Sequence, residues 1–231
     1  MNRAAQNLVL LLLGGAVLDI ALDGTYLRYV KPGLQPYLIL SGVVLLALAA
    51  VAIVRDIRKG WAATDSEHPG RAQWLLLAPI AALLVIVPPA LGATSVRSGT
   101  TAQAAVDSGD KFAFPPLPSG PAPTVRMADL LDRAAYDSSG ELDRREITVV
   151  GFIVHTETGV DLARVVITCC VADAQTMSVH LGGDFDSPPD DTWVSVRGKA
   201  VPDSARPETN MTPTLDVLEL RTVPAPARVY G

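Results

Sequence analysis

Three apolar stretches near the N-terminus constrain this chain more than any other feature. They cover residues 4–22, 37–54 and 74–91. Each approaches the roughly 20 residues that an α-helix needs to cross the hydrocarbon core of a bilayer. The first stretch also fits a signal peptide, but its end offers no small-residue cleavage site, so a retained helix is favoured. The sequence therefore predicts three transmembrane spans within residues 1–95.

Basic residues predict how these spans are oriented. Five of them flank the cytoplasmic side in the favoured topology, and three flank the opposite side: Arg3, Arg55, Arg58, Lys59 and Arg71 against Arg28, Lys31 and Arg97. Cytoplasmic loops carry an excess of Lys and Arg. We therefore expect a multi-pass protein of the cell membrane, in contact with the lipid bilayer and with its C-terminal domain on the extracytoplasmic side.

A change of composition separates the apolar part from the rest of the chain. Residues 96–124 are rich in Pro, Gly, Ser and Ala, a composition typical of a semi-rigid linker. Residues 125–136 then show apolar side chains at helical spacing, which predicts one short helix. The predicted organisation is a transmembrane region at 1–95, a linker at 96–124 and a second domain at 125–231.

The second domain is dominated by short runs of β-branched residues. Such runs, separated by turn-forming residues, are typical of an all-β barrel or sandwich. Five runs within about eighty residues favour a small closed barrel of the OB type. The fold class expected is thus a membrane α-helical part of three spans plus a small all-β, OB-like barrel with one short helix. The runs are 147–155, 165–173, 177–181, 192–198 and 215–221.

Both cysteines of the chain lie in the second of these runs. Alternation along a strand would point Cys169 and Cys170 to opposite faces, so they would not grip one metal together. His155 and His180 end neighbouring runs, a placement that could bring them close to one another or to Cys170. Cysteine and histidine are zinc-type ligands. The set Cys170, His155 and His180 is therefore one candidate metal site, and chance placement of two histidines on strands is its alternative.

Charge and motifs exclude several other classes of function. From residue 125 onward the chain has 10 Lys and Arg against 17 Asp and Glu, a net charge of 10 − 17 = −7. An acidic surface repels phosphate, so we expect no nucleic-acid partner. The acidic loop at 182–191 lacks a calcium-binding pattern and is expected to be solvated. The sequence shows no Ser/His/Asp order, P-loop or Gly-rich nucleotide-binding turn. We therefore expect that the protein is not an enzyme and has no cofactor.

Three segments of the second domain support a resemblance to a known family. They are Gly151-Phe152-Ile153, the run Ile-Thr-Cys-Cys-Val-Ala-Asp at 167–173, and Trp-Val-Ser-Val-Arg-Gly at 193–198. With the apolar N-terminus, they resemble uncharacterised bacterial membrane proteins described as permease subunits, which carry a C-terminal domain of unknown function. The resemblance covers nearly the whole chain. It implies a partner, a multi-spanning membrane permease, and no particular solute.

Two hypotheses of function follow. In the favoured one, the chain is the accessory subunit of a multi-spanning permease, and the extracytoplasmic barrel contacts that partner. In the alternative, it is a membrane-anchored surface protein that binds a metal or senses redox state through its thiols.

Overall fold

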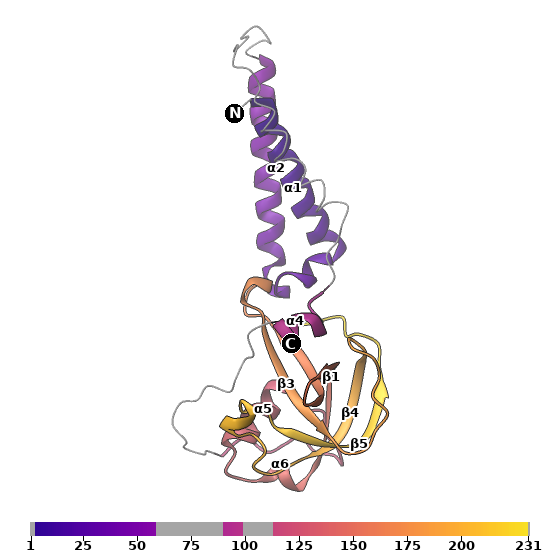
Figure 1. The fold of residues 1–231 in the computed structure, drawn as a ribbon. Helices are drawn as coiled ribbons and strands as arrows, with labels where there is room; N and C mark the ends of the chain where they lie inside the picture. Colours follow the sequence, from indigo (N-terminus) through magenta and orange to yellow (C-terminus); the bar gives the residue numbers. More distant parts are fainter. Residues whose placement is uncertain (1–2, 59–89, 99–112, 231) are drawn as a thin grey trace. The chain divides into compact units, whose positions relative to one another are not determined.

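The computed structural model describes residues 3–58, 90–98 and 113–230 (Figure 1). These residues form two compact units. The first consists of the N-terminal helices together with Cys169–Val171, and the second contains the remainder from Leu91 onward. The two units are described separately below.

Two long helices make up most of the first unit. Helix α1 spans Arg3–Asp23 and helix α2 spans Gln35–Arg58, with the short 3₁₀ helices η1 (Thr25–Arg28) and η2 (Pro32–Leu34) between them. Gly24 ends α1 in the left-handed region at φ 87°, which a residue without Cβ adopts readily. Both helices are long and apolar enough to cross a membrane. They coincide with the predicted stretches 4–22 and 37–54, whereas 74–91 lies outside the described residues except at its last two positions.

The two helices are antiparallel and meet through glycines. A Cβ added to Gly42 would lie 2.7 Å from Cγ of Leu18, and one added to Gly14 would lie 3.0 Å from Cγ of Leu46. Small residues at such positions let helix backbones approach closely. Near the ends of the pair, Asn7 Nδ2 donates to Asp56 Oδ2 at 2.9 Å. At the other end, Gln35 Nε2 donates to the Ala21 carbonyl at 2.9 Å. The contact is therefore made by close backbone packing together with polar bonds near both ends.

Five strands form the sheet of the second unit. They pair in the order β1-β2-β3-β5-β4, and β4 pairs back with β1, so the sheet closes on itself. All neighbours are antiparallel except β3 and β5, which run parallel. Four of the five predicted strand runs fall on these strands. The strands are β1 (Glu146–Thr156), β2 (Gly159–Val166), β3 (Gln175–Gly182), β4 (Trp193–Ala200) and β5 (Thr214–Thr222).

Alternation along the strands separates two apolar clusters. The larger cluster contains apolar side chains from one side of every strand. Helix α5 (Met127–Tyr136) and helix α6 (Glu141–Arg144) also contribute side chains to it. Helix α5 confirms the predicted short helix. The smaller cluster uses the other side of β1 and β2. Fully buried members of the larger cluster include Leu130, Ile147, Ile153, Leu162, Val179, Val196 and Leu215.

Part of the predicted linker is packed onto this unit. Helix α4 (Ala93–Ser98) places Ala93, which is fully buried, in the smaller cluster beside Phe152 and Val154. Leu117 is buried in the larger cluster. The described residues 91–95 belong to the second unit, and the domain boundary expected at residue 95 stays a prediction. A Pro- and Ser-rich segment can still dock where a few apolar side chains find a partner surface.

The predicted fold class is confirmed in outline. The chain has apolar N-terminal helices followed by a five-stranded sheet domain with a short helix. Within the described ranges there are two helices of membrane-spanning length.

Candidate functional site

The connection between β2 and β3 carries both cysteines. The predicted strand over 165–173 was wrong beyond its start, because β2 ends at Val166 and a 3₁₀ helix, η4, spans Val171–Asp173. The backbone N–H of Thr168 donates to Asp173 Oδ1 at 2.8 Å. An aspartate that accepts a bond from nearby backbone offers the chain an alternative to the strand ladder. That local bond explains why a run of good strand formers turns here.

This turn brings the two thiols together. Cys169 Sγ and Cys170 Sγ are 3.7 Å apart, so the expectation that they point to opposite faces was wrong. Cys169 is exposed, Cys170 is partly exposed, and neither is in a disulfide. Within the first unit, Cys170 forms an antiparallel bridge with Val30, flanked by bonds from Lys31 N–H to the Cys169 carbonyl and from Val171 N–H to the Tyr29 carbonyl. Side chains alternate between faces only in extended strand, and Cys169 and Cys170 lie in a turn.

His155, near the end of β1, lies in a network of polar side chains. Its Nδ1 is 2.8 Å from Asp190 Oδ1, and its Nε2 is 3.0 Å from Ser187 Oγ. Its backbone N–H donates to the same Asp190 oxygen at 2.8 Å. The other oxygen of Asp190 accepts a bond from Arg97 Nη1 at 2.7 Å. The imidazole is thus held from both ring nitrogens.

Asp190 is the centre of this network. The hydrogen bond from Arg97, followed by the bonds from the backbone and ring of His155, holds the pKa of its carboxyl well below the ordinary value. The neighbouring Asp191 accepts a 2.6 Å bond from the backbone N–H of Ala93. The acidic loop expected to be merely solvated therefore uses its last two aspartates to fasten α4 and the end of β1.

Ser187, His155 and Asp190 form a hydrogen-bonded chain that was not predicted from the sequence. Its hydrogen bonds follow the pattern of a serine hydrolase triad. In such a triad, however, the aspartate is buried and its charge stabilises the imidazolium. Here the side chain of His155 is 44% exposed, and Arg97 shares the carboxylate and offsets its charge. We therefore interpret the three residues as a clamp for the loop. The residues are scattered over the chain, and only the fold shows their proximity.

His180 lies on β3 opposite Asp161 of β2 in the strand register. Its Nδ1 is 2.9 Å from Asp161 Oδ1. Burial raises the pKa of the Asp161 carboxyl, and the hydrogen bond and charge of His180 oppose that rise. The ring covers Gly159, where an added Cβ would lie 2.8 Å from His180 Cε1. The His180 ring is thus held by its interaction with Asp161 and by its packing against Gly159.

The three residues of the predicted metal set lie on separate elements. Register places His155 opposite Val160 and His180 opposite Asp161, the next residue along β2, so the two histidines are on opposite faces of the sheet. Cys170 lies in the turn beyond the end of β2. In the part of the chain that the structure describes, no three His, Cys, Asp or Glu side chains are placed to hold one ion. The two histidines are therefore not brought together within the second unit, and a site that joins Cys170 to either of them stays a prediction.

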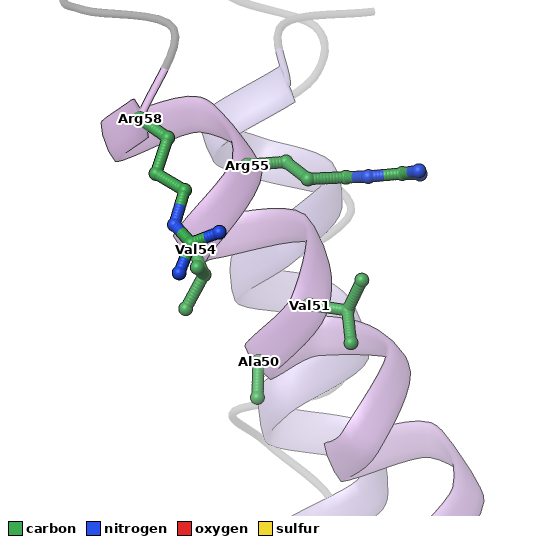
Figure 2. Close-up of a pocket in the computed structure, with 5 residues that line it drawn as sticks. All are labelled: Ala50, Val51, Val54, Arg55 and Arg58. Atoms are coloured by element: carbon green, nitrogen blue, oxygen red, sulfur yellow. The ribbon is translucent and has the colours of Figure 1, made fainter.

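A hollow on the surface of α2 lies near the C-terminal end of that helix. It is lined by Ala50, Val51, Val54, Arg55 and Arg58. Figure 2 shows the Arg58 side chain folded back toward Val54, while Arg55 extends away to the side. Aliphatic residues followed by arginines are typical of a helix end at a membrane interface. The hollow offers no catalytic group.

Comparison with known proteins places the second unit in a wider context. No curated protein and no solved structure matches the chain. Residues 130–231, which include all five strands, match the model of the DUF1980 C-terminal domain. The barrel domain is therefore similar to an uncharacterised domain family.

Proposed function

We propose that this protein is the accessory subunit of a multi-spanning membrane permease. The observation that carries the proposal is the apolar surface of α1 and α2. Only 17% of the span Gln6–Asp23 and 11% of the span Pro32–Arg58 is buried. Large apolar side chains left facing outward are costly in water and are stabilised by lipid tails or by other membrane helices. The exposed residues on α2 include Leu40, Val43, Val44, Leu48, Val51 and Val54.

The bilayer is one of the two neighbours proposed for these helices. Arg55 and Arg58 lie in the last turn of α2, where basic residues favour the cytoplasmic side. The protein is then a multi-pass component of the cell membrane. The odd number of predicted spans puts the C-terminal domain on the extracytoplasmic side.

The second unit is proposed to be an OB-like barrel that contacts the permease. The strand order β1-β2-β3-β5-β4, with β3 and β5 parallel, supports the OB-like assignment. Its excess of acidic residues argues against the nucleic acids that many such barrels bind. The clamp-like role of Ser187, His155 and Asp190 argues against hydrolysis. Contact with a protein is the function that remains consistent with both features.

Site-specific photocrosslinking in living cells tests this proposal. A photoreactive amino acid at Leu218, which is 55% exposed on β5, is expected to form an adduct when the partner lies against this side of the barrel. Further exposed sites on the other strands cover the remaining surface, and the same Leu218 variant kept without irradiation is the matched control. Mass spectrometry should identify a protein with many membrane spans in the adducts. Adducts with lipid, water or the chain itself at every exposed site would refute a permease contact.

A further inference from the structure

The adjacent thiols in the β2–β3 connection form a pair with no role in the proposed function. Cys169 Sγ and Cys170 Sγ lie 3.7 Å apart, and the exposed Cys169 makes the pair accessible from solvent. We propose that Cys169 and Cys170 together bind a thiophilic divalent cation of the zinc type. The proposal does not depend on a permease partner, since it concerns the chain alone.

The separation of the sulfur atoms matches this ligand. Zinc binds thiolate sulfur at about 2.3 Å with tetrahedral geometry. Two such bonds at a tetrahedral angle place the sulfurs roughly 3.8 Å apart. The observed 3.7 Å therefore needs almost no adjustment. Two-coordinate Cu(I), which holds its thiolates on opposite sides of the ion, would require a longer separation.

The backbone around the thiols is held in place before any ion binds. On one side, Thr168 N–H bonds to Asp173 Oδ1. On the other, the carbonyl of Cys169 accepts from Lys31 N–H at 3.0 Å, and Val171 N–H donates to the Tyr29 carbonyl at 2.8 Å. Ligands that are already ordered lose less conformational entropy on binding. The turn therefore presents both sulfurs at low cost.

The chemistry balances without an oxidant. Each thiol loses its proton, each sulfur gives an electron pair to the cation, and the two protons leave to solvent. Two of the four tetrahedral positions remain for water or for ligands from another molecule. Structural zinc sites are closed by four protein ligands, whereas open positions permit exchange. The pair is therefore suited to receiving and releasing an ion.

A disulfide between the two cysteines fits the geometry less well. Neighbouring Cα atoms are about 3.8 Å apart across a trans peptide, below the roughly 4.4–6.8 Å usual for a disulfide. The sulfurs would also have to close from 3.7 Å to about 2.05 Å. Oxidation would displace the turn, whereas cation binding would not.

The test is a zinc titration of the reduced full chain in detergent micelles, in competition with a chromophoric chelator. We expect one ion per chain, with release of about two protons per ion near neutral pH. Cys169→Ser and Cys170→Ser should each weaken binding by at least roughly 10-fold, the scale on which even supporting residues act. His155→Ala is the matched control, because it alters a zinc-type ligand outside the pair, and it should leave the affinity unchanged.

Two measurements distinguish a loss of metal binding from a loss of folding. Thermal unfolding of each variant shows whether the domain is intact. Independently, Co²⁺ added to the unaltered reduced chain should give the thiolate-to-metal charge-transfer band, and alkylation of the thiols should abolish it. The proposal is overturned if that band is absent, if zinc binding survives both cysteine substitutions, or if His155→Ala removes it. A reduced chain that forms the disulfide in air and binds no zinc after reduction would also overturn it.

Discussion

Replacing Leu215 with alanine should sharply lower the free energy of unfolding of the barrel. Leu215 lies on β5 with none of its surface exposed, within the larger apolar cluster. It packs directly over Gly198 of β4, where an added Cβ would lie 2.8 Å from Leu215 Cγ. Gly198 has no side chain with which to fill the space that the substitution leaves. The neighbouring residues therefore cannot fill the cavity that is left when the Leu215 side chain is shortened.

The size of the effect follows from this packing. Leu→Ala removes three carbon atoms, and at roughly 0.8 kcal/mol for each the lost burial is about 2.4 kcal/mol. The unfilled cavity adds to this loss, and buried Leu→Ala changes in general cost about 2–5 kcal/mol. We expect a value in the upper half of that range. Leu218→Ala, on the same strand but at a 55% exposed position, should change stability by no more than about 0.5 kcal/mol.

Urea unfolding of the full chain in detergent micelles measures both variants. Tryptophan fluorescence reports on the barrel through Trp193, after Trp61 and Trp74 are replaced by phenylalanine. Far-ultraviolet circular dichroism should show the same secondary structure for both variants. The reasoning is refuted if the two substitutions cost the same, or if Leu215→Ala costs less than about 1 kcal/mol.

Two further predictions concern the helix pair and the loop clamp. Gly42→Ile should separate α1 from α2, because even a Cβ there would lie 2.7 Å from Leu18 Cγ, whereas Gly15→Ile meets nothing within 4 Å and should be tolerated. Disulfide trapping between the helices measures the difference, and equal trapping in both variants would contradict it. The bonds from Arg97 and His155 lower the pKa of Asp190, so their stabilisation is fully present above the unfolded pKa of about 3.9 and is lost as pH falls through the folded value. The difference in stability between the native chain and Asp190→Asn should thus be constant near neutral pH and should shrink in acid. Urea unfolding midpoints over a pH series would measure this difference. A difference that grows in acid would contradict the expected direction.

Local patterns in the sequence were sufficient for the elements that depend on local physics. The apolar runs at 4–22 and 37–54 became α1 and α2, since length and hydropathy decide such helices. Alternating β-branched runs predicted β1, β3, β4 and β5, because period-two burial is visible along a single strand. Helix α5 followed from apolar side chains at helical spacing.

Tertiary structure decided the arrangement of chemically active side chains. The strand pattern wrongly extended through Cys169 and Cys170, because the bond between Thr168 and Asp173 that ends the strand depends on loop conformation rather than on propensity. The grouping of His155 with Asp190 arises from residues 35 apart in the chain. Which segments form apolar helices and strands could be predicted, since neighbouring residues carry that information. Only the fold decided which polar groups meet, because those contacts join residues whose separation in the chain says nothing about their distance in space.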